Sequence, residues 1–353
     1  MGIIRTLLAV CVIVAHSGPL LGYNSVGGKV AVQCFFIISG FYMAMILKEK
    51  YQAKENAYWL FISNRFLRIF PLYWAVLLIV FVFSCYVFAG DNSSEIGLYS
   101  SNILNLRLSF FQSLFLLFTN LFIFFQDTVM FLSFNGNGLK FVSDFRTSSP
   151  PVYGFLFVPQ AWTIALELLF YTIAPFLVKL KTGTIFFLII LSVGIRYLLY
   201  SSGLNFDPWT YRFFPAELGF FLLGIIAYEL YCRFSPSVVI QKISFLYLLI
   251  FIIFFDRLHI WHKEEILYGS FVLLLPAIFE FTKSTRFDRE IGELSYPIYI
   301  LHIFIIQVMD FFHVESTLLA ILLSVVFSFI ITKTITKKIE DYRASRITKL
   351  KTV

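Results

Sequence analysis

Apolar runs of about 20 residues recur along nearly the whole of this sequence, and no other feature restricts its fold as much. A membrane-spanning helix needs about 17–25 such residues. Of the 353 residues, 59% are hydrophobic and only 14% are charged, whereas soluble chains carry about 25% charged residues. A chain of this composition lacks the polar surface that a water-soluble globule needs. The sequence therefore predicts a polytopic membrane protein.

Eleven runs qualify as candidate spans, and the eighth is the shortest. They are Ile3–Leu21, Val30–Leu47, Phe70–Ala89, Leu108–Met130, Pro159–Val178, Thr184–Tyr200, Phe213–Tyr231, Ile243–Phe255, Ile266–Phe281, Ile291–Phe312 and Thr317–Ile335. Polar and apolar residues do not alternate within these runs, as they do in the strands of a membrane barrel. We therefore predict an all-α fold, a polytopic transmembrane helix bundle.

The basic residues predict the orientation of the bundle, because Lys and Arg collect in cytoplasmic loops. They cluster at Lys48–Arg68, Lys179–Lys181, Arg233–Lys242, Lys283–Arg289 and Lys333–Lys351. These clusters agree with one another only if Leu108–Met130 begins and ends on the outer side, between Asp91–Arg107 and Asn135–Ser149. We therefore expect about ten spans plus one re-entrant or interfacial segment, with both termini in the cytoplasm.

No long polar linker or internal repeat divides the sequence. We expect a single transmembrane domain over residues 1–335 and a basic cytoplasmic tail over residues 336–353. The net charge of +7 is explained by orientation and not by nucleic-acid binding. The four cysteines show no metal or redox spacing, so we predict no metal site. The first span is expected to stay in the protein, because no clear small-residue cleavage site precedes the second.

When most of those at the run ends are set aside, six ionisable residues remain inside the runs, where such groups are costly and usually face the bundle interior or a watery cavity. They are Arg5, His16, Glu167, Arg196, Glu217 and His302. Arg5 and His16 are separated by about 16 Å along a helix axis. This spacing places Arg5 at the cytoplasmic rim and His16 beyond the bilayer midplane. A lone histidine in a span is more often packed than catalytic, but the other buried polar residues favour a functional role.

Arg65 and Arg68 are three residues apart, so they share one helical face at the cytoplasmic start of the third span. One interpretation is that they only mark the cytoplasmic end of the span, as Lys and Arg commonly do in membrane proteins. The other is that they bind the phosphates of a cytoplasmic anion, which guanidinium groups pair with well.

Five segments together resemble acyltransferase family 3, the integral-membrane O-acyltransferases. Arg5 and His16 are similar to its Arg-x10-His signature, and Arg65–Pro71 resembles its Arg-x-x-Arg-x-x-Pro stretch. The other three segments are Cys34–Phe41, Ala161–Tyr171 and Ser295–His302. They resemble the family's Phe-Phe-x-x-Ser-Gly-Phe, Trp-Ser-Leu-x-x-Glu-x-x-Phe-Tyr and Ser-Tyr-x-x-Tyr-x-x-His blocks. All five occur in the family's order, between residues 5 and 302.

This resemblance implies an enzyme of the bacterial inner membrane that moves an acetyl group from acetyl-CoA to a hydroxyl of a cell-surface or exported carbohydrate. Acetyl-CoA would be a substrate, with no permanently bound cofactor. His16 would be the general base, and Glu167 would orient the imidazole or the sugar. Arg5, Arg65 and Arg68 would hold the coenzyme A phosphates. The expected lining of the acceptor cavity is Ser39, Trp162, Tyr296, Tyr299 and His302.

Two departures weaken the role of Glu167 relative to that of His16. Thr163 and Ile164 stand where the family usually has Ser-Leu, and Leu168 stands where many members have a second glutamate. A transporter or flippase of lipid-linked sugars is the competing function, since it too would bury Arg, Glu and His. No inverted repeat supports that alternative. The acceptor sugar, the oligomeric state and the choice between direct transfer and an acyl-histidine relay stay open.

Overall fold

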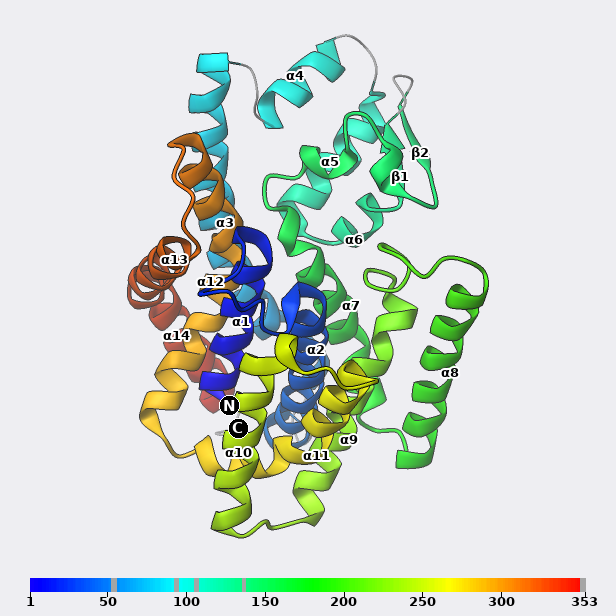
Figure 1. The fold of residues 1–353 in the computed structure, drawn as a ribbon, viewed down its shortest axis with the longest axis vertical. Helices are drawn as coiled ribbons and strands as arrows, with labels where there is room; N and C mark the ends of the chain where they lie inside the picture. The colour runs from blue at the N-terminus through cyan, green and yellow to red at the C-terminus, as the bar shows by residue number, and fades with distance from the viewer. Residues whose placement is uncertain (52–55, 92–94, 105–107, 135–137, 350–353) are drawn as a thin grey trace. The chain divides into compact units, whose positions relative to one another are not determined.

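The structure is a computed structural model that describes residues 1–353 except 52–55, 92–94, 105–107, 135–137 and 350–353. Nearly all of its regular elements are helices (Figure 1). The helices are α1 (Gly2–Ser17), α2 (Gly27–Ile46), α3 (Ala57–Asp91), α4 (Glu95–Leu104), α5 (Phe110–Phe122), α6 (Gln126–Val129), α7 (Trp162–Leu177), α8 (Thr182–Ser201), α9 (Phe214–Arg233), α10 (Val238–Phe254), α11 (Lys263–Thr282), α12 (Arg286–Phe311), α13 (Thr317–Ile331) and α14 (Lys337–Lys349). The two strands are β1 (Leu132–Phe134) and β2 (Leu139–Phe141). Short 3₁₀ or π-helical turns are η1 (Leu47–Tyr51), η2 (Phe145–Thr147), η3 (Val152–Phe155), η4 (Pro159–Ala161), η5 (Phe255–Arg257) and η6 (Thr332–Thr336).

Within the described residues, 9 helical stretches are long and apolar enough to cross a membrane, and α1 and α5 are shorter apolar helices. Each of these stretches corresponds to one predicted run. The prediction of an all-α polytopic membrane bundle is therefore confirmed. α10 begins at Val238 rather than Ile243, so the run that looked short in sequence forms a full-length span together with η5. α3 begins at Ala57, which places Arg65 and Arg68 inside a continuous helix.

The segment Leu108–Met130, predicted not to cross the membrane, forms a short helix and a return. α5 has 13 residues, or roughly 20 Å, which is less than the ~30 Å hydrocarbon core. The backbone then reverses at Ile123 and Phe125, both with positive φ, and enters α6. Leu108 before α5 and Met130 after α6 belong to one hydrophobic cluster. Their shared cluster agrees with a segment that enters and leaves on the same side.

Contacts divide the chain into two compact units. The first unit contains residues 1–68, 173–190 and 218–353, and the second contains residues 69–172 and 191–217. In the first unit α1 packs against α2, α12 and α13, while α11 packs against α2 and α10. The second unit holds the antiparallel hairpin β1–β2, with Leu132 opposite Phe141. Sequence analysis predicted no element in this hairpin, because its strands have only three residues each.

Hydrogen bonds fix α1 at both ends, and this fixes the position of His16. The Asp288 carboxylate accepts the backbone N–H groups of Gly2 (2.7 Å) and Ile3 (2.9 Å), so it caps the start of the helix. At the other end, the Thr317 hydroxyl of α13 donates to the Ser17 carbonyl at 2.8 Å. α1 is therefore held in one register beside α12 and α13.

Gly40 has a packing role within the Phe-Phe-x-x-Ser-Gly-Phe segment. A Cβ at Gly40 would lie 1.9 Å from the Phe221 carbonyl oxygen, and a Cβ at Gly224 would lie 2.0 Å from that of Ile37. The two glycines therefore allow the backbones of α2 and α9 to touch, as small residues commonly do between membrane helices. This contact explains the glycine of the motif by packing alone.

Candidate active site

His16 and His302 face each other in the first unit. His16 lies at the end of α1 and is exposed, whereas His302 lies within α12 and has an exposed fraction of 0%. The centroids of the two rings are 5.2 Å apart, and the ring planes are tilted by 39°. Residues from two distant sequence motifs thus form a single pair of imidazoles, one accessible and one buried behind it.

The hydrogen bond of His302 defines its tautomer. Its Nδ1 lies 2.6 Å from the Tyr299 carbonyl oxygen, and a carbonyl can only accept, so Nδ1 carries the proton. In a neutral imidazole the other nitrogen, Nε2, then has a lone pair. Nε2 is buried and has no hydrogen-bond partner among the described residues. The buried imidazole therefore offers one acceptor atom.

Tyr299 completes the immediate surroundings of His302. Its ring centroid lies 5.7 Å from that of His302 and 6.3 Å from that of Phe35 in α2. Tyr299 is buried, and Tyr296, one turn earlier in α12, is half-buried. Ser39 is buried in α2 at 8% exposure. The structure thus brings Tyr299 to the histidine pair, while the cavity-lining roles of Tyr296 and Ser39 stay predictions.

A second polar cluster lies near the start of α1. The Arg5 guanidinium lies 5.8 Å from the centre of the Tyr42 ring and hydrogen-bonds the Tyr42 hydroxyl. Arg68 acts electrostatically on the same Tyr42 and on Glu293. Of the predicted phosphate-site residues, Arg5 therefore contacts Tyr42, and Arg68 lies near enough to act on its charge. Sequence analysis missed Tyr42. The only signal that could have identified it is its position two residues after Gly40, the glycine of the Phe-Phe-x-x-Ser-Gly-Phe segment.

Arg65 differs from Arg68 in its surroundings although both lie on α3. Arg65 is only 4% exposed, and its guanidinium packs over the Phe61 ring at 5.6 Å from the centroid. Arg68 is half-buried. Of the two arginines, Arg68 is thus the one that acts on Tyr42. Arg65 is buried and packs on Phe61 of the same helix.

Glu167 and Trp162 belong to the second unit. The Tyr171 hydroxyl donates to the Glu167 carboxylate at 2.7 Å, one turn along α7. Trp162 is 5% exposed, with the Arg212 guanidinium 4.2 Å from its ring and the Tyr211 ring 4.7 Å away. Side chains of the same unit, Arg212 and Tyr211, therefore pack against the Trp162 ring. The predicted roles of Glu167 and Trp162 toward His16 and the sugar stay predictions.

Two other intramembrane charges neutralise each other. Arg196 of α8 donates to the Glu217 carboxylate of α9 at 2.6 Å and to the carbonyls of Thr210 and Ala216 at 3.1 Å each. Glu217 has an exposed fraction of 0%. Because both charges are paired and hydrogen-bonded, a structural role accounts for them.

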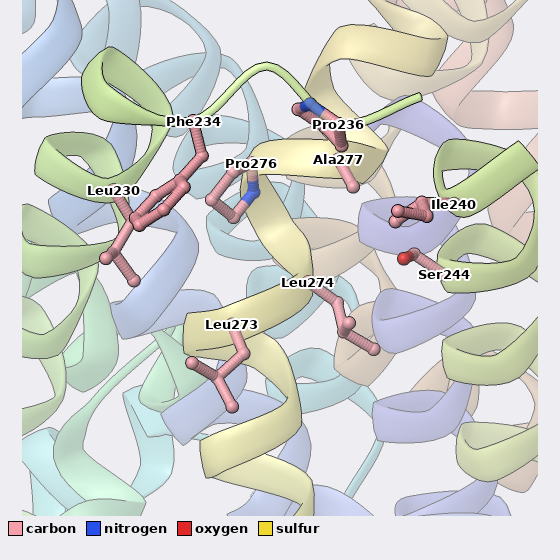
Figure 2. Close-up of a pocket in the computed structure, with 9 residues that line it drawn as sticks. All are labelled: Leu230, Phe234, Pro236, Ile240, Ser244, Leu273, Leu274, Pro276 and Ala277. Atoms are coloured by element: carbon pink, nitrogen blue, oxygen red, sulfur yellow. The ribbon is translucent and has the colours of Figure 1, made fainter. Parts of the chain in front are cut away.

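A cavity of about 220 Å³ lies among residues of α9, α10, α11 and the connection between α9 and α10, and Figure 2 shows the residues that line it. Its lining is apolar except for Ser244, and it includes Leu230, Phe234 and Leu273. Such a lining offers no acid, base or charge for acyl transfer. The predicted site residues around His16 and Arg5 are not part of the lining of this cavity.

The family profile that describes an acyltransferase domain, Acyl_transf_3, matches residues 1–336. The chain belongs to acyltransferase family 3. An uncharacterized protein of Aquifex aeolicus (strain VF5) is 25% identical over 216 residues, which cover 56% of this chain and 93% of the relative. No solved structure matches the chain. The resemblance seen in the five motifs is therefore confirmed, and the protein is a multi-pass membrane acyltransferase.

Among the residues that the structure describes, no group of three His, Cys, Asp or Glu side chains could hold a metal ion. In the first unit, the structure groups the predicted site residues into two sets, the imidazoles of His16 and His302 and the arginines near Tyr42. Sequence analysis identified these residues as candidates but did not predict which of them lie together. The pairing of His302 with His16 needs the register of α1 on α12, which no local pattern encodes.

Proposed function

We propose that the protein transfers an acetyl group from acetyl-CoA to a hydroxyl of a cell-surface or exported carbohydrate, with His16 as general base. One observation carries this proposal. Helix α1 has an arginine cluster at its start, through Arg5, and an imidazole pair at its end, through His16. The two are separated by about 16 Å along the helix axis, a distance that the pantetheine arm of coenzyme A can cover. One helix thus links a phosphate site to a base.

The arginine cluster would bind the nucleotide end of the donor. Coenzyme A is strongly anionic, and guanidinium groups pair with phosphate through two parallel hydrogen bonds. Arg5 and Arg68 are half-buried, so they combine partial desolvation with access. The basic clusters in the sequence support a cytoplasmic position for this end, since Lys and Arg mark the cytoplasmic loops.

In the proposed reaction, an imidazole nitrogen of His16 takes the proton of the acceptor hydroxyl. The hydroxyl oxygen forms a bond to the thioester carbonyl carbon, and the carbon–sulfur bond breaks. The coenzyme A thiolate leaves and takes the proton back from the imidazolium of His16. Atoms and charge then balance, with the acetyl ester and the free thiol as products.

His302 would be a positioning residue for His16. Its Nε2 lone pair can accept the N–H of one nitrogen of His16, which leaves a lone pair on the other nitrogen for the acceptor hydroxyl. Burial of His302 and its hydrogen bond to Tyr299 hold that acceptor atom in place. The exposed position of His16 supports its role as the imidazole that meets substrate.

Mass spectrometry of surface glycans tests the proposal in cells with and without the gene. Loss of one acetyl unit per repeat, restored by the intact gene, is the expected result. Loss of the whole glycan from the surface would instead favour a transporter or flippase of lipid-linked sugars. Glycans of unchanged mass and amount would contradict acyl transfer to these carbohydrates.

A further inference from the structure

The C-terminal helix α14 folds back onto the start of α3. The Arg346 guanidinium donates to the Asn64 side-chain oxygen at 2.8 Å and to the Ser63 hydroxyl at 2.9 Å. Asn64 in turn donates to the Tyr51 hydroxyl at 2.8 Å. Ser63 and Asn64 immediately precede Arg65 in the chain. α14 is therefore fixed next to the Arg65–Arg68 motif.

Arg343 lies one turn before Arg346 on α14 and points into the protein. It is 6% exposed, and its Nε is buried without a hydrogen-bond partner among the described residues. Its Nη1 pairs with Glu340 of the same helix. Arg68 and Tyr51 also act on Arg343 electrostatically. Since Arg346 fixes α14 beside α3, Arg343 and Arg68 lie near enough for their charges to interact.

Two like charges near one another oppose folding unless something between them is negative. Glu340 neutralises part of Arg343, and the exposed Glu293 lies near Arg68 and Glu340. The buried Nε of Arg343 still has an unused hydrogen, and Arg5 adds a further positive charge beside Tyr42. Several arginine side chains in one region, one of them with an unused buried donor, are typical of a binding site for a phosphate group.

We infer that Arg343 belongs to the donor site, where it binds a phosphate of the coenzyme A nucleotide together with Arg68. This inference rests on the proposed function, because it deepens the donor site described there. The family match ends at residue 336, so the family resemblance assigns nothing to Arg343. The tail that sequence analysis interpreted only as an orientation signal would then contribute to donor binding.

Anionic lipid headgroups are the other anions that α14 could meet. Its exposed Lys337 and Lys338 suit that contact. Arg343 does not, because at 6% exposure it is buried within the protein and does not face the surroundings. The donor phosphate is therefore the ligand that the position of Arg343 favours.

Isothermal titration of the purified full-length protein tests this inference with two probes, coenzyme A and the acetyl thioester of pantetheine. The variants are Arg343→Gln, Arg343→Lys and Arg68→Gln. Arg286→Gln is the matched control, because the Arg286 side chain is 84% exposed and pairs with Glu290. We expect Arg343→Gln to weaken coenzyme A binding about tenfold and to leave binding of the pantetheine thioester unchanged. Arg343→Lys should restore part of the affinity, and Arg286→Gln should bind like wild type.

The outcomes separate this inference from the proposed function. If Arg343→Gln binds coenzyme A like wild type while Arg68→Gln does not, the inference is wrong and the donor site stands. If Arg343→Gln weakens both probes equally, Arg343 only holds α14 in place, and the inference is again wrong. If wild type does not bind coenzyme A, or Arg68→Gln binds it normally, the proposed donor site itself fails. Thermal unfolding of each variant without ligand shows whether Arg343→Gln folds, and Arg343→Lys retains the charge if it does not.

Discussion

The buried nitrogen of His302 makes a specific prediction at the scale of single residues. His302→Phe fills the same space but removes the acceptor Nε2, so His16 would lose its tautomer partner. We expect kcat to fall about ten- to a hundredfold with little change in KM for acetyl-CoA. His302→Gln returns an acceptor oxygen and should recover part of kcat. Steady-state kinetics measure the split, and a Phe variant with wild-type kcat would exclude the positioning role.

Asp127 of α6 predicts a pH dependence of stability. Burial raises the pKa of this carboxyl from 3.8 to about 6, although Arg212 lowers it in part. The unfolded chain therefore loses this proton at lower pH than the folded protein does. Stability from this group is complete below about pH 4 and decreases as the pH rises through about 6, by about 3 kcal/mol.

Asp127→Asn should remove that dependence. Thermal unfolding of the purified protein between pH 4 and pH 8 measures it. We expect the melting temperature of wild type to fall relative to the Asn variant as the pH rises through about 6. Parallel curves for the two proteins would show that folding does not raise the pKa of Asp127.

Sequence analysis found the histidines and most of the arginines but not their partners. Arg5 and His16 could be selected because charged groups are costly in an apolar run. Tyr42 and Arg343 carry no such signal, since a tyrosine is common in membrane helices and an arginine is common in a basic tail. Their positions depend on the packing of α2 and α14, which residue type alone does not predict.

At the scale of elements, the ion pair between α8 and α9 predicts that removal of one partner destabilises the protein strongly and that replacement of both partners restores most of the stability. Glu217→Ala leaves the Arg196 guanidinium partly buried without its carboxylate, which costs about 3–5 kcal/mol for a buried pair. Replacing both residues together, Arg196→Met with Glu217→Leu, should recover most of that loss. Unfolding in detergent measures both variants. A double variant as unstable as the single one would mean that the two residues do not act as a pair.

The spans were predictable because hydropathy reports the part of each helix inside the hydrocarbon core. Their ends were less so. α3 was predicted from Phe70 but begins at Ala57, since its first turns contain the polar residues Ser63 and Asn64 and the charged residues Arg65 and Arg68. α10 begins before Gln241 and Lys242, whose long side chains can reach the membrane surface while the helix continues. Hydropathy alone places a helix end where the apolar run stops.

At the scale of the whole molecule, the return of the chain after α5 predicts the topology of its flanks. Residues before and after Leu108–Met130 should both be outside. Ser94 lies outside the described residues, so single cysteines at the exposed Ser101 and Ser143 are the sites of choice. In a background without the native cysteines, a membrane-impermeant maleimide should label both on intact spheroplasts. It should label Lys338→Cys in the tail only after permeabilisation.

A different pattern of labelling would contradict the predicted topology. If Ser101→Cys reacts on intact spheroplasts and Ser143→Cys reacts only after permeabilisation, the segment spans the membrane. The ten-span arrangement would then be wrong, and every later span would have the opposite orientation. The order of the spans was predictable from charge and hydropathy. The two contact units were not, because each combines segments that are distant in the sequence.

Acetyl transfer by the purified protein tests the central claim, that His16 is the base of a membrane acetyltransferase. Wild type, His16→Ala and His262→Ala are reconstituted in liposomes with radiolabelled acetyl-CoA and the carbohydrate that lost its acetyl group in cells. His262 is the matched control because its side chain is 73% exposed and lies outside the site. We expect His16→Ala to lose about 10²–10⁴-fold in rate while it binds coenzyme A normally and His262→Ala keeps the wild-type rate. Transfer by His16→Ala at a rate near wild type would contradict the assignment of His16 as the base.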